Sequence, residues 1–583
     1  MTDTSPVRIK KLLSRRLTTA ILVVACLTGT VNVSAQDISQ IGKSDPLIIT
    51  GSIGTNNTYY HSTSGAGYMS PLSNTVFANL NISLYGISMP FTFYYSNSNL
   101  DFSYPQFSFN ISPSYKNFTA HIGQSTMPFS NYLLNMSFNG VGVEYNGSKF
   151  RASAFYGILR KAINDNPEDP NPRKPQYRRL GWGFSTGYTW RGNSVDLYLL
   201  RVYDSPGSID EYWHQYYHPQ ENLLVGLKTM VNIKSCLSFS ANVATSAFTA
   251  DKESQKITSG EATRFDKIFE PRYTTTMRFA GDATLGLTFP WMHASVSYKI
   301  LQPDYQSLGT YYTSNNYHSL GINLGTTLFR RLSLSASFSG QADNLAKQQL
   351  YTTKGYVYNT VAALRLGDNF SLSAMYNGYL QNQSEGTQKV NDTTRVHRVL
   401  HSVSLVPTYN IMGNCYDHAM SLSANYTVNK DLNRFAEGKN DVKTLALGAS
   451  YDLGVKPWET NFTLSLSHQN TKGYNMEYTS DVMSLSTGHS FLKEKNLSTS
   501  GTVSLCYNEV KNQTKNLSLA LDLTASYTIK KVHAISLSAS VSKYGDVNMQ
   551  ESETSYNATD IRVSLNYLYT FTLLELKKKA KNK

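Results

Sequence analysis

The chain has 583 residues, a formal net charge of +13 and a mean hydropathy of −0.33, with 40% hydrophobic and 12% aromatic residues. Its four cysteines are widely spaced, which excludes a disulfide framework and a cysteine-based metal centre. Tyrosine is abundant, at 41 residues, and is typical of strands, so the composition fits a large all-β protein. Composition leaves open whether that protein is secreted or embedded in a membrane, because only alternate residues of a membrane strand face lipid.

Residues 1–35 have the pattern of a cleavable signal peptide, with basic residues ahead of an apolar core over 17–27. Small residues precede the junction between Ala35 and Gln36, where we expect cleavage. A lipoprotein site at Cys26 is the alternative, but the apolar stretch continues past that cysteine. No later segment reaches the ~20 apolar residues that a spanning helix needs, so a membrane-embedded form must be a closed barrel.

After a short segment over 36–45, alternation of apolar and small polar residues dominates the chain. It is clearest from Leu332 onward, where every second residue is apolar and most of the others are serine. The longest stretches keep this period for about 9 to 11 residues, as a tilted membrane strand requires, whereas strands of soluble sandwiches average about five or six. Strand length therefore favours a transmembrane barrel, and the clearest stretches are 332–339, 370–374, 464–467, 517–527 and 535–541.

Short turns and long polar loops follow one another along the chain. This is the arrangement of outer-membrane barrels, in which short turns are periplasmic and long loops are extracellular. We expect tight turns near residues 146–148, 191–193, 289–291, 367–369, 412–414, 454–457, 493–495 and 530–531. We expect long loops over 160–175, 204–220, 251–271, 383–394, 429–440 and 545–558.

Counting strands from Leu47 to Leu573 predicts about 26, within a range of roughly 22 to 28. An even number puts both termini in the periplasm and requires the first strand to pair with the last, which alternates up to Phe571. The lysine-rich tail carries no nucleic-acid motif, so we expect a solvated periplasmic tail and no nucleic-acid partner. The predicted parts are the signal peptide, a short periplasmic segment, the barrel and the basic tail, over 1–35, 36–45, 46–574 and 575–583.

Positions that alternate with the apolar residues are expected to face the lumen, and most are small or polar. Charged residues there are sparse and of mixed sign, so they predict no selectivity ladder of one charge. Comparably large barrels are plugged, and the predicted segment before the first strand is too short for a folded plug. We therefore expect a partner to fill or cap the lumen. The charged lumenal candidates are Glu144, Asp196, Arg278, Asp282, Asp522 and Arg562.

Motifs for catalysis and metal binding are weak. Residues 183–187 match the nucleophile elbow around Ser185, but they lie in a strand-like stretch and no helix follows, so a chance match is expected. Asp165, Glu168 and Asp169 crowd one long loop, where a surface calcium site is a minor alternative to a solvated loop. We expect no cofactor, no metal and no enzymatic activity.

Several sequence blocks fall in the first 200 residues, among them Asp45-Pro-Leu-Ile-Ile-Thr-Gly-Ser and Leu84-Tyr-Gly-Ile-Ser-Met-Pro-Phe-Thr-Phe. With further blocks up to residue 199, they resemble the uncharacterised outer-membrane β-barrel proteins of the Bacteroidota. That resemblance implies an outer-membrane barrel but no activity, so it transfers no functional residue. Asp392-Thr393-Thr394 also resembles the short O-glycosylation sequence of that phylum. The strand number is similar to that of the lipopolysaccharide translocon barrel, whose periplasmic domain the predicted parts lack.

The sequence thus predicts an integral outer-membrane barrel that acts as a channel or translocation pore, gated or filled by a partner. The alternative from another class is a membrane scaffold that anchors surface or periplasmic proteins. An outer-membrane hydrolase using Ser185 is a more distant alternative. The expected partners are outer-membrane lipid and lipopolysaccharide, the barrel-assembly machinery, and a plug or surface protein.

Overall fold

The computed structural model describes residues 47–576, apart from 65–69, 86, 98–106, 167, 169–172, 259–267, 313, 394, 492–493, 495 and 547–556. The signal peptide, its cleavage junction at Ala35 and Gln36, and the tail from residue 577 lie outside the described residues. The strands are β1 (Leu47–Ser62), β2 (Leu72–Leu84), β3 (Ile87–Ser96), β4 (Phe107–Ile111), β5 (Ser114–Tyr115), β6 (Phe118–Ser125), β7 (Phe138–Asn146), β8 (Phe150–Arg160), β9 (Arg179–Trp190), β10 (Asn193–Asp204), β11 (Glu221–Lys234), β12 (Leu237–Thr249), β13 (Thr275–Thr288), β14 (Met292–Leu301), β15 (Tyr317–Leu328), β16 (Leu332–Asp343), β17 (Tyr351–Leu366), β18 (Phe370–Glu385), β19 (His397–Met412), β20 (Tyr416–Asp431), β21 (Val442–Val455), β22 (Thr460–Lys472), β23 (Glu477–Phe491), β24 (Leu497–Val510), β25 (Thr514–Ile529), β26 (His533–Asp546) and β27 (Ala558–Leu576).

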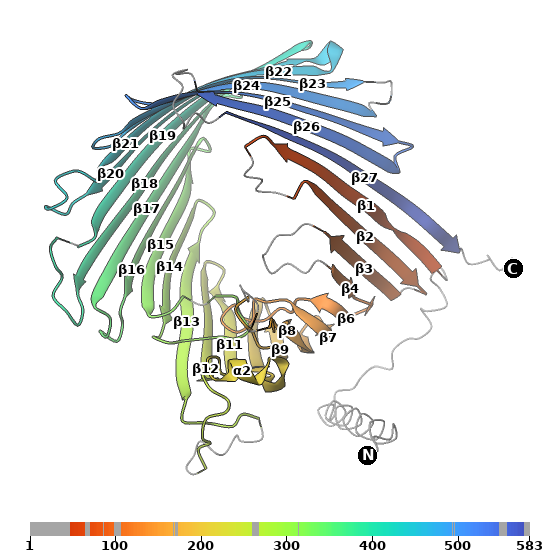
Figure 1. Cartoon of the computed structure of the whole chain (residues 1–583), viewed down its shortest axis with the longest axis vertical. Helices are drawn as coiled ribbons and strands as arrows, with labels where there is room; N and C mark the ends of the chain where they lie inside the picture. The colour runs from red at the N-terminus through yellow and green to blue at the C-terminus, as the bar shows by residue number, and fades with distance from the viewer. Residues whose placement is uncertain are drawn as a thin grey trace.

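These strands form one closed antiparallel barrel (Figure 1). β4 and β5 are two halves of a single barrel strand, because both pair with β3 on one side and β6 on the other. The break between them contains Pro113, which has no amide hydrogen for the ladder. The barrel therefore has 26 strands, and β1 pairs with β27 from Leu47 opposite Leu576 to Ser62 opposite Asp560. The predicted strand number and first-to-last pairing are confirmed.

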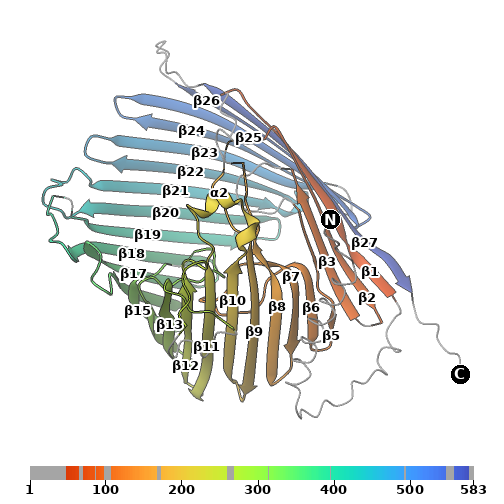
Figure 2. The same cartoon turned by 60° about the horizontal axis from the view of Figure 1, so that its bottom comes forward.

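The two rims of the barrel differ. Short connections such as 147–149, 191–192 and 530–532 lie at the rim where β1 begins and β27 ends. The long loops lie at the opposite rim, together with the short connections 473–476 and 511–513. One long loop carries the 3-10 helix η2 (Pro206–Ser208) and the helix α2 (Glu211–His214), which Figure 2 shows beyond the end of the β10–β11 pair. At the short rim, η4 (Lys456–Trp458) forms the predicted turn between β21 and β22.

Several strands extend further than the alternation predicts. β17, β18, β19 and β20 each have 16 residues, and β18, β20 and β26 continue into stretches expected to be loops. Polar residues continue these ladders because neighbouring strands still pair their backbone amides and carbonyls beyond the apolar band. The predicted loops starting at 383, 429 and 545 are accordingly shorter than expected.

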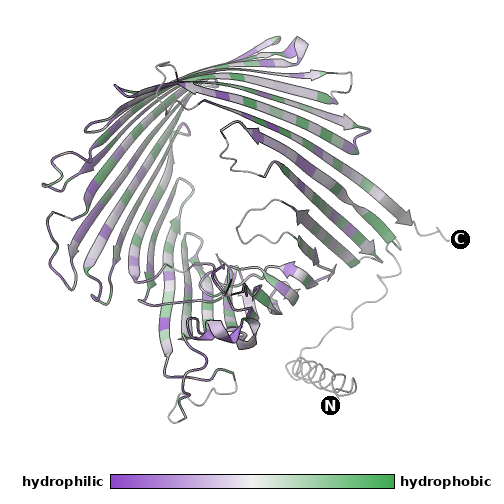
Figure 3. Ribbon diagram, viewed as in Figure 1, coloured by the Kyte–Doolittle hydropathy of each residue, from purple (hydrophilic) through white to green (hydrophobic). Residues whose placement is uncertain are grey.

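Alternating side chains explain why the strands form a barrel wall. In β25 the leucines at 517, 519, 521 and 523 are exposed on one face, and small or polar residues alternate with them. Hydrophobic and hydrophilic bands alternate along many strands of the barrel (Figure 3). A row of exposed leucines on a closed barrel is suited to lipid, since lipid-facing residues alternate with lumenal ones. No helix among the described residues is long and apolar enough to span a membrane.

Candidate functional site: two loops packed on the barrel wall

Two loops from the long-loop rim form a hydrophobic core against one arc of the barrel. Loop A comprises residues 126–137 between β6 and β7, and loop B comprises residues 302–316 between β14 and β15. Their apolar side chains pack together with residues of β7, β8 and β10 to β14. The core consists of Met127, Phe129, Leu133, Leu134, Met136, Phe138, Phe155, Leu159, Tyr198, Leu200, Val202, Leu224, Ala244, Phe248, Ala280, Leu301, Tyr305 and Leu308.

This core lies on the face of the wall that points away from the exposed apolar side chains. Leu200 and Leu224 are both 0% exposed, whereas Leu197 and Val225 of the same strands are each 51% exposed. Because lipid covers the outer face of a transmembrane barrel, we assign the exposed row to the outside and the core to the lumen. Loops A and B therefore fold inward over the wall.

Glycines in the wall make room for the loop side chains. A Cβ atom at Gly183 would lie 2.8 Å from the Cζ atom of Phe129 and 2.6 Å from Cε1 of Phe155. At Gly226 a Cβ atom would lie 2.8 Å from Cδ1 of Leu133. All three separations are shorter than real Cβ contacts, so larger residues at these positions would displace loop A.

Hydrogen bonds join the two loops to each other. The Tyr305 hydroxyl donates to the carbonyl of Tyr132 at 2.9 Å, and the Ser307 hydroxyl donates to the carbonyl of Leu133 at 2.6 Å. The amide of Asn135 donates to the carbonyl of Gly309 at 3.0 Å. Buried carbonyls and amides need such partners, so the loops satisfy each other's backbone where water is excluded.

Further hydrogen bonds tie the loops to the wall. Ser130 of loop A donates to Oδ1 of Asn242 at 2.8 Å, and the amide of Leu308 in loop B donates to Oδ1 of Asn222 at 3.1 Å. Asn222 is fully buried and also donates to Ser246 at 2.7 Å. Burying each large apolar side chain contributes about 1.5–3 kcal/mol, so several such residues and these bonds keep the loops docked.

A cavity of about 400 Å³ lies where both loops meet β12 to β15, lined by Asn131, Tyr132, Asn242, Asp282, Lys299, Leu301, Tyr312, Ser314 and Tyr317. The Tyr132 hydroxyl donates to Asp282 at 2.7 Å, and burial together with this bond raises the pKa of Tyr132. The Lys299 ammonium lies 5.9 Å from the Tyr132 ring centroid and 5.6 Å from that of Tyr317. The cavity therefore offers a cation, a carboxylate and aromatic faces.

The six charged candidates have different surroundings. Glu144 lies 3.3 Å from His121, and Asp196 forms an ion pair of 2.6 Å with Arg151. Arg278 donates from Nε to the carbonyl of Pro303 at 3.0 Å, which ties loop B to β13. Of the six, only Asp282 lines the cavity between the loops.

Asp522 and Arg562 lie far from the loops. They occupy one row of neighbouring strands, because Asp522 is opposite Ser540 and Ser540 is opposite Arg562. Both are exposed, and neither makes an ion pair with another described residue. The structure therefore brings Asp282 and Arg278 to the loops and leaves this second pair on an uncovered part of the wall.

Buried ion pairs near the long-loop rim were not anticipated from the sequence. Arg179 binds Asp204 in a bidentate manner at 2.7 and 3.0 Å, and Arg201 lies 2.5 Å from Glu221. Asp204 and Glu221 are almost fully buried, so each carboxylate depends on its arginine. The first pair joins β9 to β10, and the second joins β10 to β11.

The weak chemical motifs have structural roles. Ser185 forms a hydrogen bond of 2.6 Å with Ser153, and within the described part of the chain no histidine bonds to Ser185. Asp165 of the suggested calcium loop binds Arg173 through two bonds of 2.6 and 2.7 Å, which lower the pKa of Asp165 to about 2. Glu168 lies in a turn of the same loop, and its neighbour Asp169 lies outside the described residues.

The proposed glycosylation sequence is described only in part. Asp392 lies 2.9 Å from Arg434, and the Thr393 hydroxyl donates to Asn391 at 2.8 Å. Thr394 lies outside the described residues.

The sequence of β8 and β10 carries a signal for the inward loops. Residues 154–159 read Ala-Phe-Tyr-Gly-Ile-Leu, and residues 197–200 read Leu-Tyr-Leu-Leu, so apolar residues fall on both faces of these strands. A barrel strand with two apolar faces needs lipid on one side and protein on the other. Loss of alternation in β8 and β10 therefore marks the arc that the loops cover.

No family model matches the chain, and a search of curated proteins finds no relative. Among solved structures, the translocation pore of the P pilus usher PapC matches with 10% identity and a TM-score of 0.35, over 90% of this chain and 100% of that chain. OccAB3 of Acinetobacter baumannii matches with 12% identity and a TM-score of 0.30, over 62% of this chain and 95% of that chain. OccK8 (OprE) of Pseudomonas aeruginosa matches with 9% identity and a TM-score of 0.31, over 60% of this chain and 92% of that chain. The barrel described above rests on this chain's own strand pairing.

Proposed function

We propose that the protein is an outer-membrane channel whose lumen is narrowed by its own loops A and B. The observation that carries this proposal is that the loops cover only one arc of the inner wall. Most buried side chains lie between residues 125 and 344, whereas the wall from β16 to β27 keeps its alternate polar residues accessible.

The size of the barrel supports a water-filled path beside the loops. Twenty-six strands spaced ~4.8 Å apart and tilted by ~40° trace a ring of roughly 50 Å diameter if circular. Loops of 12 and 15 residues cannot fill that width. Loops A and B thus supply part of the material that we expect to fill the lumen. A separate plug or surface protein remains a prediction.

Orientation and location belong to the same proposal. Because short turns of bacterial barrels face the periplasm, the rim that carries both chain ends is assigned to the periplasm and loops A and B to the outer side. Outer-membrane lipid and lipopolysaccharide would then surround the exposed apolar band, and the barrel-assembly machinery would insert it. The proposed relationship to the Bacteroidota barrel family is supported only by the sequence blocks given above.

Conductance in planar lipid bilayers tests the channel. Purified barrel is compared with a variant in which residues 128–136 are replaced by a flexible glycine-serine linker, after both show the heat-modifiable migration of a folded barrel. We expect discrete conductance steps from the wild type and larger steps from the variant. Two folded but silent proteins would contradict the proposal, and a stably copurifying partner would then favour a scaffold.

A further inference from the structure

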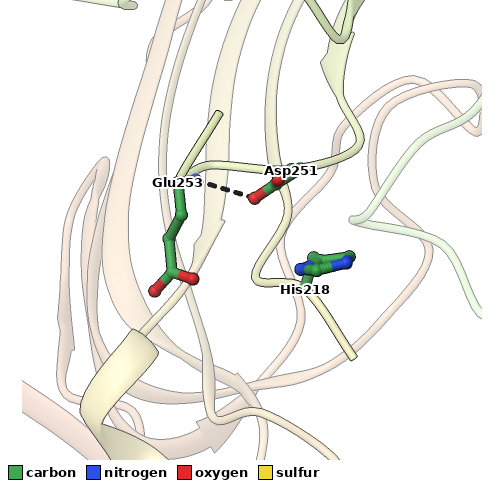
Figure 4. Close-up of side chains that lie close together, drawn as sticks. All are labelled: His218, Asp251 and Glu253. Carbon is green, nitrogen blue, oxygen red and sulfur yellow. Dashed lines mark hydrogen bonds between the residues drawn. The ribbon is translucent and has the colours of Figure 1, made fainter. Parts of the chain in front are cut away.

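A histidine and two acidic residues meet where two long loops touch at the rim opposite the chain ends. His218 lies in loop 205–220, and Asp251 and Glu253 lie in loop 250–274. One ligand atom from each side chain lies within 4.8 Å of the others, and the three surround a common space (Figure 4). His218 and Glu253 are exposed and Asp251 is half-buried, so solutes can reach this space.

Backbone contacts hold the two loops in this arrangement. The amide of Lys252 donates to the carbonyl of Pro219 at 2.7 Å, next to His218 in the chain. Oδ1 of Asp251 accepts a bond of 2.8 Å from the amide of Glu253, which leaves its second carboxylate oxygen free of that bond (Figure 4). These contacts set the backbone positions of His218 and Asp251, whereas the exposed side chains of His218 and Glu253 can still change rotamer.

The donor set selects for a particular class of metal. Ca²⁺ takes six to eight oxygen ligands, whereas one imidazole with carboxylates suits Zn²⁺ and similar ions. Ligand atoms about 2.0–2.1 Å from a tetrahedral Zn²⁺ lie about 3.4 Å apart. Closing from separations of up to 4.8 Å requires a movement of about 1 Å, within reach of rotamer changes in exposed side chains.

His214 supports the cluster from its other side. Its Nδ1 atom lies 3.5 Å from Oε1 of Glu253, and the Tyr177 ring lies edge-on to the imidazole at 5.6 Å between centroids. Burial, followed by the nearby carboxylates of Glu253, Asp204 and Asp251, raises the pKa of Tyr177 to about 12, so this neighbour stays neutral. His214 is thus a positioning residue for Glu253, in the way that outer-shell groups orient metal ligands.

Two lysines near the cluster contact aromatic rings. The Lys252 ammonium lies 4.8 Å from the Tyr203 ring centroid, and that of Lys174 lies 5.7 Å from the Tyr217 ring centroid. Cations over aromatic faces are stabilised there and leave Asp251 and Glu253 available to a metal ion.

We propose that His218, Asp251 and Glu253 bind one divalent transition-metal ion of the Zn²⁺ class, with water in the remaining position. The ion clamps loop 205–220 to loop 250–274 at the long-loop rim. This inference is independent of the proposed channel, because the cluster would bind metal whether or not the barrel conducts.

Co²⁺ and Zn²⁺ titrations of metal-free, tag-free protein in detergent test the site. We expect one Co²⁺ per chain with visible absorption bands of a four- or five-coordinate site, abolished by one equivalent of Zn²⁺ but not by Ca²⁺. His218→Ala should abolish these bands, Glu253→Gln should weaken them, and His214→Ala should reduce Zn²⁺ affinity by about 10–100-fold.

His468→Ala is the matched control. His468 on β22 pairs with one acid, Asp481 on β23, at 2.7 Å, and among the described residues it belongs to no group of three metal-ligating side chains. It should bind metal like the wild type. Heat-modifiable migration confirms that each variant is folded. Absence of stoichiometric Co²⁺ binding by wild-type protein overturns the proposal, as do bands that persist in both His218→Ala and Glu253→Gln.

Discussion

Leu133 offers the sharpest test of how loop A is held in the lumen. Its side chain is 0% exposed and lies against Gly226 of β11, while its carbonyl accepts the bond from Ser307 of loop B. Leu133→Ala keeps the backbone bond and removes the packing. Large-to-small changes of this kind cost about 2–5 kcal/mol, depending on how well the site collapses.

That cost changes the occupancy of the docked loop directly. At 1.4 kcal/mol per factor of ten, the undocked population rises by about 30-fold to a few thousandfold, provided that the barrel stays closed. Undocking of loop A from the wall, rare in the wild type, would become frequent in the variant. We expect more frequent or larger conductance steps in planar bilayers and faster proteolytic cleavage within residues 126–137.

Leu324→Ala is the matched control, because Leu324 of β15 is 50% exposed on the apolar outer face. It should leave conductance and cleavage unchanged. If Leu133→Ala accelerates cleavage but conductance stays at the wild-type level, the loop does not restrict the pore. If neither quantity changes, the packing argument itself is wrong.

Three further changes probe the wall, its ion pairs and the cavity. Gly183→Ala should destabilise the loop core by about 1–3 kcal/mol and open the pore, because its Cβ atom would lie 2.6 Å from the nearest packed ring. At Gly325 a Cβ atom meets nothing within 4 Å, so Gly325→Ala should leave conductance in the same bilayer assay unchanged. Asp204→Asn should cost about 3–5 kcal/mol in urea unfolding, because it removes the carboxylate that neutralises the buried Arg179. Asp417→Asn breaks an exposed pair and should cost at most about 1 kcal/mol, and equal costs would contradict this reasoning. Lys299→Gln should shift the reversal potential in a salt gradient toward cation selectivity, since it removes the positive charge from the cavity between the loops. An unchanged reversal potential would mean that permeant ions avoid that cavity.

The sequence by itself determined the wall of this protein. Period-two alternation in stretches such as 332–339 and 517–527 specifies which face of each strand meets lipid, and a slip by one residue would reverse both faces. Short turns join every second pair of neighbouring strands, and the strand number counted from the same pattern is even. Closure of β1 on β27 follows, since no strand edge can be left unpaired in lipid.

Only the tertiary structure decided what lies inside the barrel. Tyr132 and Tyr305 meet although 173 residues separate them, and His218 meets Asp251 from a different loop. Periodicity reports the local environment of a strand but carries no information on which distant loop covers it. The apolar inner faces of β8 and β10 signal a covering, whereas its identity depends on loop closure and on the hollows that wall glycines offer.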